Sequence, residues 1–181
     1  MLDTRYELAE YCKGRSEILN RKVKVIEIGL GFGDFSTYLL KSAGKNIKLI
    51  SVESWKGRYR RTKMRKVRNL VLDRMSKYLL NKHYSFEVIE KDSADACNEF
   101  GNNTIDVVYI DGDHSYDGVK ADIENWYPKV IYGGLFGGHD YKKIGVRGVR
   151  DAVNEFVLEH NLYVHITEDY STNPSWFVIK K

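Results

Sequence analysis

Two short clusters of acids and histidines could do metal or acid–base chemistry. Residues 111–114 read Asp-Gly-Asp-His and residues 139–140 read His-Asp, and each cluster directly follows an apolar run. Carboxylates gathered in one cleft repel each other unless a cation offsets their charge. The clusters therefore predict a metal site if the fold brings them together. The alternative is that these acids cap helices, with Asp113 capping a helix that begins near Tyr116.

A glycine-rich turn is the third candidate feature. Residues 23–28 are mostly apolar and β-branched, and three alternating glycines follow them directly: Gly29, Gly31 and Gly33. Glycine has no Cβ, so a ligand can approach the backbone N–H groups at the start of the next helix. We expect Asp34 to cap that helix near Phe35. The pattern predicts a nucleotide-like ligand, although glycine turns also occur for packing reasons.

The elements that must position these residues follow from hydrophobic periodicity. Strands are expected at residues 23–28, 47–52, 84–89, 105–110, 135–138, 162–167 and 175–180. Helices are expected at residues 4–18, 35–42, 59–81, 94–100, 116–130 and 146–160. Because alternating strands and helices require right-handed crossovers, we expect an α/β fold with a doubly wound, mostly parallel, seven-stranded sheet. The last two strands should form an antiparallel β-hairpin.

Length and composition favour one domain over residues 1–181, in which residues 1–22 form a short helical segment. The chain has 181 residues, of which 43% are hydrophobic and 30% charged, as in ordinary globular proteins. No apolar run approaches the roughly 18 residues that span a bilayer, and the N-terminus does not read as a signal peptide. Cys12 and Cys97 have no metal-type spacing. We therefore expect a cytoplasmic protein with no membrane partner.

Further candidates lie just after the other strands, where doubly wound sheets bind their ligands. Glu53 follows the second strand, 20 residues beyond Gly33, and could accept both hydroxyls of a ribose. Asp92 and Ser93 follow the third strand and could reach an adenine edge. The alternative is that Glu53 is a surface acid and that Asp92 or Ser93 caps a helix.

Residues 27–33, Glu-Ile-Gly-Leu-Gly-Phe-Gly, resemble the first motif of class I S-adenosylmethionine-dependent methyltransferases. Dinucleotide oxidoreductases instead show Gly-x-Gly-x-x-Gly, and Asp34 stands where its last glycine would be. Residues 109–122 and 133–141 are similar to the small-molecule O-methyltransferases that include macrocin and cephalosporin-cluster enzymes, and more distantly to catechol O-methyltransferase. The resemblance covers residues 23–181 and implies a Rossmann-like fold.

The resemblance also implies a cofactor and a site. S-adenosylmethionine would be held by Glu27, Gly29, Gly31, Gly33, Glu53, Asp92, Ser93 and Asp111. A divalent cation, Mg²⁺ or Mn²⁺, would be held by Asp111, His139 and Asp140. The histidine departs from the family's usual carboxylate or asparagine ligands, and Mg²⁺ prefers oxygen. Either the metal is softer, such as Mn²⁺, or His139 is a base.

The expected reaction is metal-assisted O-methylation of a hydroxyl on a small molecule or sugar. The metal held by Asp111 and Asp140 would lower the pKa of the hydroxyl, and His114 or His139 would take its proton. One alternative is a metal-independent methyltransferase acting on nitrogen or RNA. Another is a binding module without turnover, while the glycine pattern and the terminal hairpin disfavour a nicotinamide-dependent oxidoreductase.

Residues 56–82 carry eleven Lys or Arg residues and one acid, Asp73. They read either as a solvated helix face or as a patch for polyanions. No recognition motif for nucleic acid accompanies them, so we do not expect a nucleic-acid partner. About 20 residues precede the first strand. The site is therefore expected to be open or to be completed by a second copy of the chain, as a homodimer.

Overall fold

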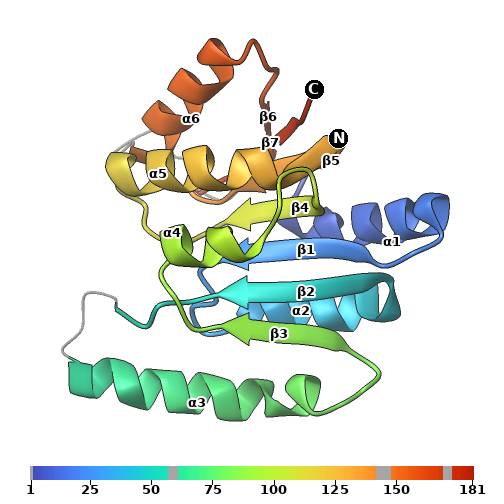
Figure 1. Ribbon diagram of the computed structural model, residues 1–181, viewed down its shortest axis with the longest axis vertical. Coiled ribbons are helices and arrows are strands. Elements are labelled where there is room, and N and C mark those ends of the chain that lie inside the picture. The colour runs from blue at the N-terminus through green and yellow to red at the C-terminus, as the bar shows by residue number, and fades with distance from the viewer. Residues whose placement is uncertain (1, 57–60, 142–147, 169–172) are drawn as a thin grey trace.

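A single seven-stranded sheet forms the centre of the computed structural model, which describes residues 2–56, 61–141, 148–168 and 173–181 (Figure 1). The strand order is β3-β2-β1-β4-β5-β7-β6, with β1 to β5 parallel and β7 antiparallel to both of its neighbours. The strands are β1 (Val23–Ile28), β2 (Ile47–Val52), β3 (Ser85–Ile89), β4 (Ile105–Ile110), β5 (Val130–Gly138), β6 (His165–Ile166) and β7 (Trp176–Ile179). The predicted Rossmann-like α/β fold is confirmed.

Helices cover both faces of the sheet, as the crossover rule requires. One face packs against α1 (Leu8–Leu19), α2 (Asp34–Ala43) and α3 (Arg61–Leu79). The other packs against α4 (Ser93–Ala96), α5 (Tyr116–Trp126) and α6 (Gly148–Glu159). Short 3₁₀ turns complete the elements at Arg5–Glu7 (η1), Gly44–Asn46 (η2), Cys97–Glu99 (η3) and Tyr127–Lys129 (η4).

The central strands are apolar because both of their faces are covered. Every residue of β4 is buried, including one acid, Asp106. Its carboxylate accepts two hydrogen bonds from the Arg21 guanidinium, both at 2.7 Å, and one from the Lys24 N–H at 2.8 Å. A buried charge is tolerated where it is paired in this way.

Several predicted boundaries are wrong. The helix expected over residues 116–130 ends at Trp126, and β5 begins at Val130 rather than at residue 135. Pro128 lies in the intervening 3₁₀ turn and cannot donate the hydrogen bond that would continue a helix. The helix expected over residues 94–100 is one α-turn followed by η3, and β6 has only two residues. The helix starts expected at residues 59 and 146 lie outside the described residues.

Asp34 does not cap α2. The helix begins at Asp34, and the capping position is Gly33, with φ +75°. The Asp34 carboxylate instead accepts a hydrogen bond from the Arg74 guanidinium at 2.6 Å. This contact joins α3 to the glycine turn. Among the described residues, no helix is both long and apolar enough to cross a membrane.

Candidate active site

The carboxyl ends of β2, β1, β4 and β5 place the candidate residues in one row. Strand register aligns Val52 with Ile28, Ile28 with Ile110, and Ile110 with Gly138. The residue after each strand therefore lies at the same edge of the sheet, which gives the row Glu53, Gly29, Asp111 and His139. The backbone continues the pairing, because the Asp111 N–H donates to Ile28 O at 2.7 Å.

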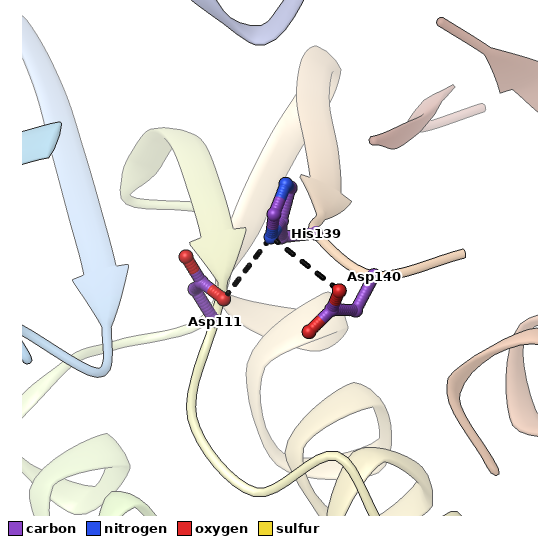
Figure 2. A group of neighbouring side chains, drawn as sticks. All are labelled: Asp111, His139 and Asp140. Atoms are coloured by element: carbon purple, nitrogen blue, oxygen red, sulfur yellow. Dashed lines mark ion pairs between the residues drawn. The ribbon is translucent and has the colours of Figure 1, made fainter. Parts of the chain in front are cut away.

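Asp111, His139 and Asp140 form a cluster whose side chains could hold a metal ion (Figure 2). One side-chain donor atom of each lies within 4.8 Å of the others. His139 Nδ1 is 3.6 Å from Asp111 Oδ1 and 3.8 Å from Asp140 Oδ1. Consecutive side chains of a strand point to opposite faces. Strand β5 ends at Gly138, and Asp140 has a left-handed conformation with φ +60°, so its side chain and that of His139 face the same site.

His114 joins the two carboxylates of this cluster. Its Nδ1 lies 2.7 Å from Asp140 Oδ2, and its Nε2 lies 3.4 Å from Asp111 Oδ1. Hydrogen bonds to Asp111 and Asp140 raise the pKa of His114 to about 10. Burial raises the pKa of Asp111, but hydrogen bonds from His114 and His139 outweigh it and hold that pKa at about 2. Protonated His114 therefore supplies positive charge beside these carboxylates. A divalent cation held by Asp111, Asp140 and His139 would take over that role, because two carboxylates and an imidazole are a donor set that fits one.

Asp113 is not part of the cluster and is not the cap of α5. Ser115 occupies the capping position, and its Oγ accepts the Gly118 N–H at 3.1 Å. The Asp113 carboxylate accepts the Ser115 N–H at 2.9 Å, one step earlier in the same turn. The cap reading of Asp113 is therefore wrong, and the turn it supports positions His114.

The glycine turn offers an open cradle beside Asp111. Gly29 has φ +93°, and a Cβ there would lie 2.3 Å from Asp111 O, so the turn packs tightly against the loop after β4. Gly31 has φ +53°, but a Cβ there would meet no atom within 4 Å. The Gly31 N–H donates to Glu53 Oε2 at 3.2 Å, and the Trp55 N–H donates to Glu53 Oε1 at 2.9 Å. Open space above Gly31, bordered by a carboxylate, fits the ribose and methionine parts of S-adenosylmethionine.

Glu27 lies beneath this turn rather than in its open space. It is 1% exposed, and its carboxylate accepts hydrogen bonds from Ser36 Oγ and from Ser51 Oγ, the latter at 2.5 Å. Burial raises the pKa of Glu27 to about 7, against the opposing effect of the two serines. The structure therefore places Glu27 as a support of the turn, and its contact with a cofactor stays a prediction.

The candidate adenine residues are held by neighbours from the loop after β2 and from α5. The Asp92 backbone caps α4, but its side chain makes no cap hydrogen bond and pairs with Lys56. Ser93 Oγ accepts the Trp126 Nε1–H at 2.7 Å and bonds to buried Asp122. Side-chain capping by Asp92 or Ser93 is thus not what fixes this turn.

Arg5 reaches the site, although nothing in the sequence marks it out. Its Nη1 lies 3.8 Å from Asp111 Oδ2, and its side chain is 23% exposed. The sequence also does not mark out Asp122, which bonds to Ser93 and whose pKa burial raises to about 6. An isolated arginine near a chain end and an acid in a helix carry no spacing signal, because both act through contacts distant in sequence.

Comparisons with known proteins agree with this geometry. A methyltransferase domain family matches residues 26–141. A relative from Sinorhizobium fredii, uncharacterized protein y4gI, is 37% identical over 43 residues, which are 24% of this chain but only 5% of that protein. An O-methyltransferase from Bacillus cereus in complex with SAH has a TM-score of 0.68 at 15% identity, over 96% of this chain and 80% of that one.

A second solved structure is CalS11, a TDP-rhamnose 3'-O-methyltransferase of calicheamicin biosynthesis. It has a TM-score of 0.66 at 14% identity, over 96% of this chain and 78% of that one. At these identities the structures establish the fold, and the family match covers well over half of the chain. The chain belongs to the methyltransferase domain family.

Proposed function

We propose that this methyltransferase transfers the methyl group of S-adenosylmethionine to a hydroxyl of a small molecule or sugar, with help from a divalent cation. The observation that carries the proposal is the cluster of Asp111, His139 and Asp140, beside the open glycine turn. The similarity to CalS11, which acts on a sugar, supports a hydroxyl acceptor.

The roles follow from position. Asp111 and Asp140 offer oxygen ligands and His139 a nitrogen ligand, a set that favours Mn²⁺ over Mg²⁺. A bound divalent cation would orient the acceptor hydroxyl and lower its pKa. His114 contacts both carboxylates and is placed to accept the proton once the cation takes over their charge. The cofactor's methyl is already activated, so alignment is the chain's main contribution.

The test is a screen with labelled S-adenosylmethionine against catechols, polyhydroxylated aromatics and nucleotide sugars, in Mn²⁺, Mg²⁺ or EDTA. We expect turnover that EDTA abolishes, and a loss of at least about 100-fold for Asp111→Asn and for Asp140→Asn. Asp117→Asn, an exposed acid at the start of α5, is the matched control. Calorimetry of Mn²⁺ binding to the same variants gives a readout besides activity. Full turnover in EDTA with Asp111→Asn intact would remove the metal from the mechanism.

RNA is the second candidate acceptor. Figure 1 shows that α3 starts at the edge of the sheet where β1 to β4 end. Arg65 and Lys66 are exposed in its first half. A positive surface there would attract a phosphate backbone. Methylation of RNA that persists in EDTA and weakens steeply with salt would favour this candidate.

A further inference from the structure

The segment before α1 is held in place at three points. His165 Nε2 donates to Leu2 O at 2.6 Å, and the Glu168 N–H donates to Asp3 O at 3.0 Å. The Tyr38 hydroxyl donates to Tyr6 O at 3.0 Å. These bonds tie the segment to the C-terminal strands on one side and to α2 on the other. The backbone that carries Arg5 is therefore fixed relative to the site.

The Arg5 guanidinium lies between α2 and the end of β4. Its central carbon is 5.3 Å from the centre of the Phe35 ring, in the first turn of α2, and 5.2 Å from that of Tyr6. Its Nη2 donates to the Tyr6 hydroxyl at 3.3 Å. Aromatic stacking orients a guanidinium and leaves its edge N–H groups available for an anion.

Asp111 and the Arg5 guanidinium form a long ion pair and not a close hydrogen bond. The 3.8 Å between Arg5 Nη1 and Asp111 Oδ2 exceeds the 2.7–2.9 Å of a charge-assisted hydrogen bond. The other oxygen of Asp111 faces His114 and His139 at 3.4 and 3.6 Å. Arg5 also hydrogen-bonds to Tyr109. Because a guanidinium carries five N–H donors, Arg5 still has N–H groups for a further carboxylate.

The row of strand ends indicates which carboxylate this is. Glu53, the candidate ribose ligand, follows β2, whereas Arg5 contacts Asp111 after β4. Adjacent strands lie about 4.8 Å apart, so these ends are about 10 Å apart with the glycine turn between them. A cofactor with its ribose at Glu53 that crosses the turn brings its amino-acid end to Arg5.

We propose that Arg5 binds the carboxylate of S-adenosylmethionine and makes the site selective for the intact amino-acid end of the cofactor. This inference rests on the proposed function. It assigns a binding role to a residue outside the glycine motif. It also gives the segment before α1 a task, because the three bonds that hold the segment place Arg5.

Two ligands that differ only in this carboxylate test the inference: S-adenosylmethionine and decarboxylated S-adenosylmethionine. Calorimetry in EDTA removes any metal from the comparison. We expect the wild-type chain to bind the intact cofactor about 10- to 100-fold more tightly. Arg5→Met should lose that preference and leave the affinity for the decarboxylated ligand unchanged. Arg5→Lys keeps the positive charge but cannot form a bidentate bond, so its preference for the intact cofactor should lie between those of wild type and Arg5→Met. Lys13→Met, in α1 and paired with Glu10, is the control and should behave as wild type.

Equal affinity of the wild-type chain for both ligands would overturn the inference, even if Arg5→Met did not fold. An equal loss for both ligands in Arg5→Met would also overturn it, since Arg5 would then support the site without touching the carboxylate. In both cases the proposed function would stand, because the wild-type chain binds the cofactor. Binding of neither ligand by the wild-type chain would overturn the proposed function together with this inference.

Discussion

Replacing Glu27 by glutamine should change how stability depends on pH. Glu27 is buried beneath the glycine turn, and its pKa is raised from 4.5 to about 7 because burial disfavours the charged carboxylate. In the unfolded chain the carboxyl ionises at its ordinary value. Between these two values the folded state holds a proton that the unfolded state has released. The free energy of unfolding contributed by this group therefore falls as pH rises through this window.

The size follows from the same two values. Each pKa unit is worth about 1.4 kcal/mol, so the interval from 4.5 to about 7 amounts to about 3 kcal/mol. The contribution is fully present below pH 4.5 and lost above pH 7. In Glu27→Gln no proton is exchanged at this position, and the Ser36 and Ser51 hydroxyls can rotate to meet the amide. The wild-type chain should therefore lose about 3 kcal/mol relative to the variant between pH 4 and pH 8.

The measurement is urea unfolding of both chains at half-unit pH steps, followed by tryptophan fluorescence. The difference between the two curves cancels every other titrating group. Glu17→Gln, an exposed acid on α1, is the matched control and should show no such trend. A difference between wild type and Glu27→Gln that stays flat, or that grows in favour of wild type as pH rises, would refute the reasoning.

Three further substitutions test two buried polar contacts of the fold, at the starts of β4 and β5, and the open space at the glycine turn. Lys180→Met should cost about 2–4 kcal/mol in denaturant unfolding, because Lys180 Nζ donates to three backbone carbonyls, with Val130 O at 2.8 Å. Asp106→Asn should cost about 1–3 kcal/mol by the same measurement, because it breaks the paired bonds from Arg21. Gly31→Ala should cost only about 1 kcal/mol, since its Cβ meets nothing, yet it should weaken S-adenosylhomocysteine binding at least 10-fold in calorimetry because the methyl enters the cradle. If Gly31→Ala bound S-adenosylhomocysteine with unchanged affinity, the cofactor would not bind at this turn.

The central strands could be predicted to the residue because their signal is local. The bounds of β1, β2 and β4 match the apolar runs, which are continuous where both faces are covered. The start of β5 could not, because residues 132–134, Tyr-Gly-Gly, read as a turn. In the fold, Gly133 N donates to Lys180 O and Lys180 N donates to Gly134 O. The pairing that makes this segment a strand comes from residues more than forty positions away.

The candidate site divides in the same way. That residues after β4 and β5 would lie together follows from the rule that parallel strands end at one edge. The contacts that set their chemistry do not follow from it. His114 bridges Asp111 and Asp140 only because Ser115 caps α5 and Asp113 supports the turn before it. The conformation of this turn and the left-handed backbone of Asp140 both depend on tertiary contacts, and a single sequence does not predict them.

The site is harder to predict from the sequence than the fold, because part of it depends on contacts between residues far apart in the chain. The turn at Gly29 and the ends of β4 and β5 come from the middle of the sequence, where motifs are compact. The backbone of residues 2–6 reaches the same edge only because it bonds to His165 and Glu168, near the other end. We call these contacts between residues 2–6 and residues 165–168 the closure. The closure, and not a sequence motif, brings Arg5 to the site. A variant such as His165→Ala, which loosens the closure without touching Arg5 or Asp111, should therefore weaken S-adenosylmethionine more than its decarboxylated form. Equal affinities in wild type and variant would show that the closure has no part in placing Arg5.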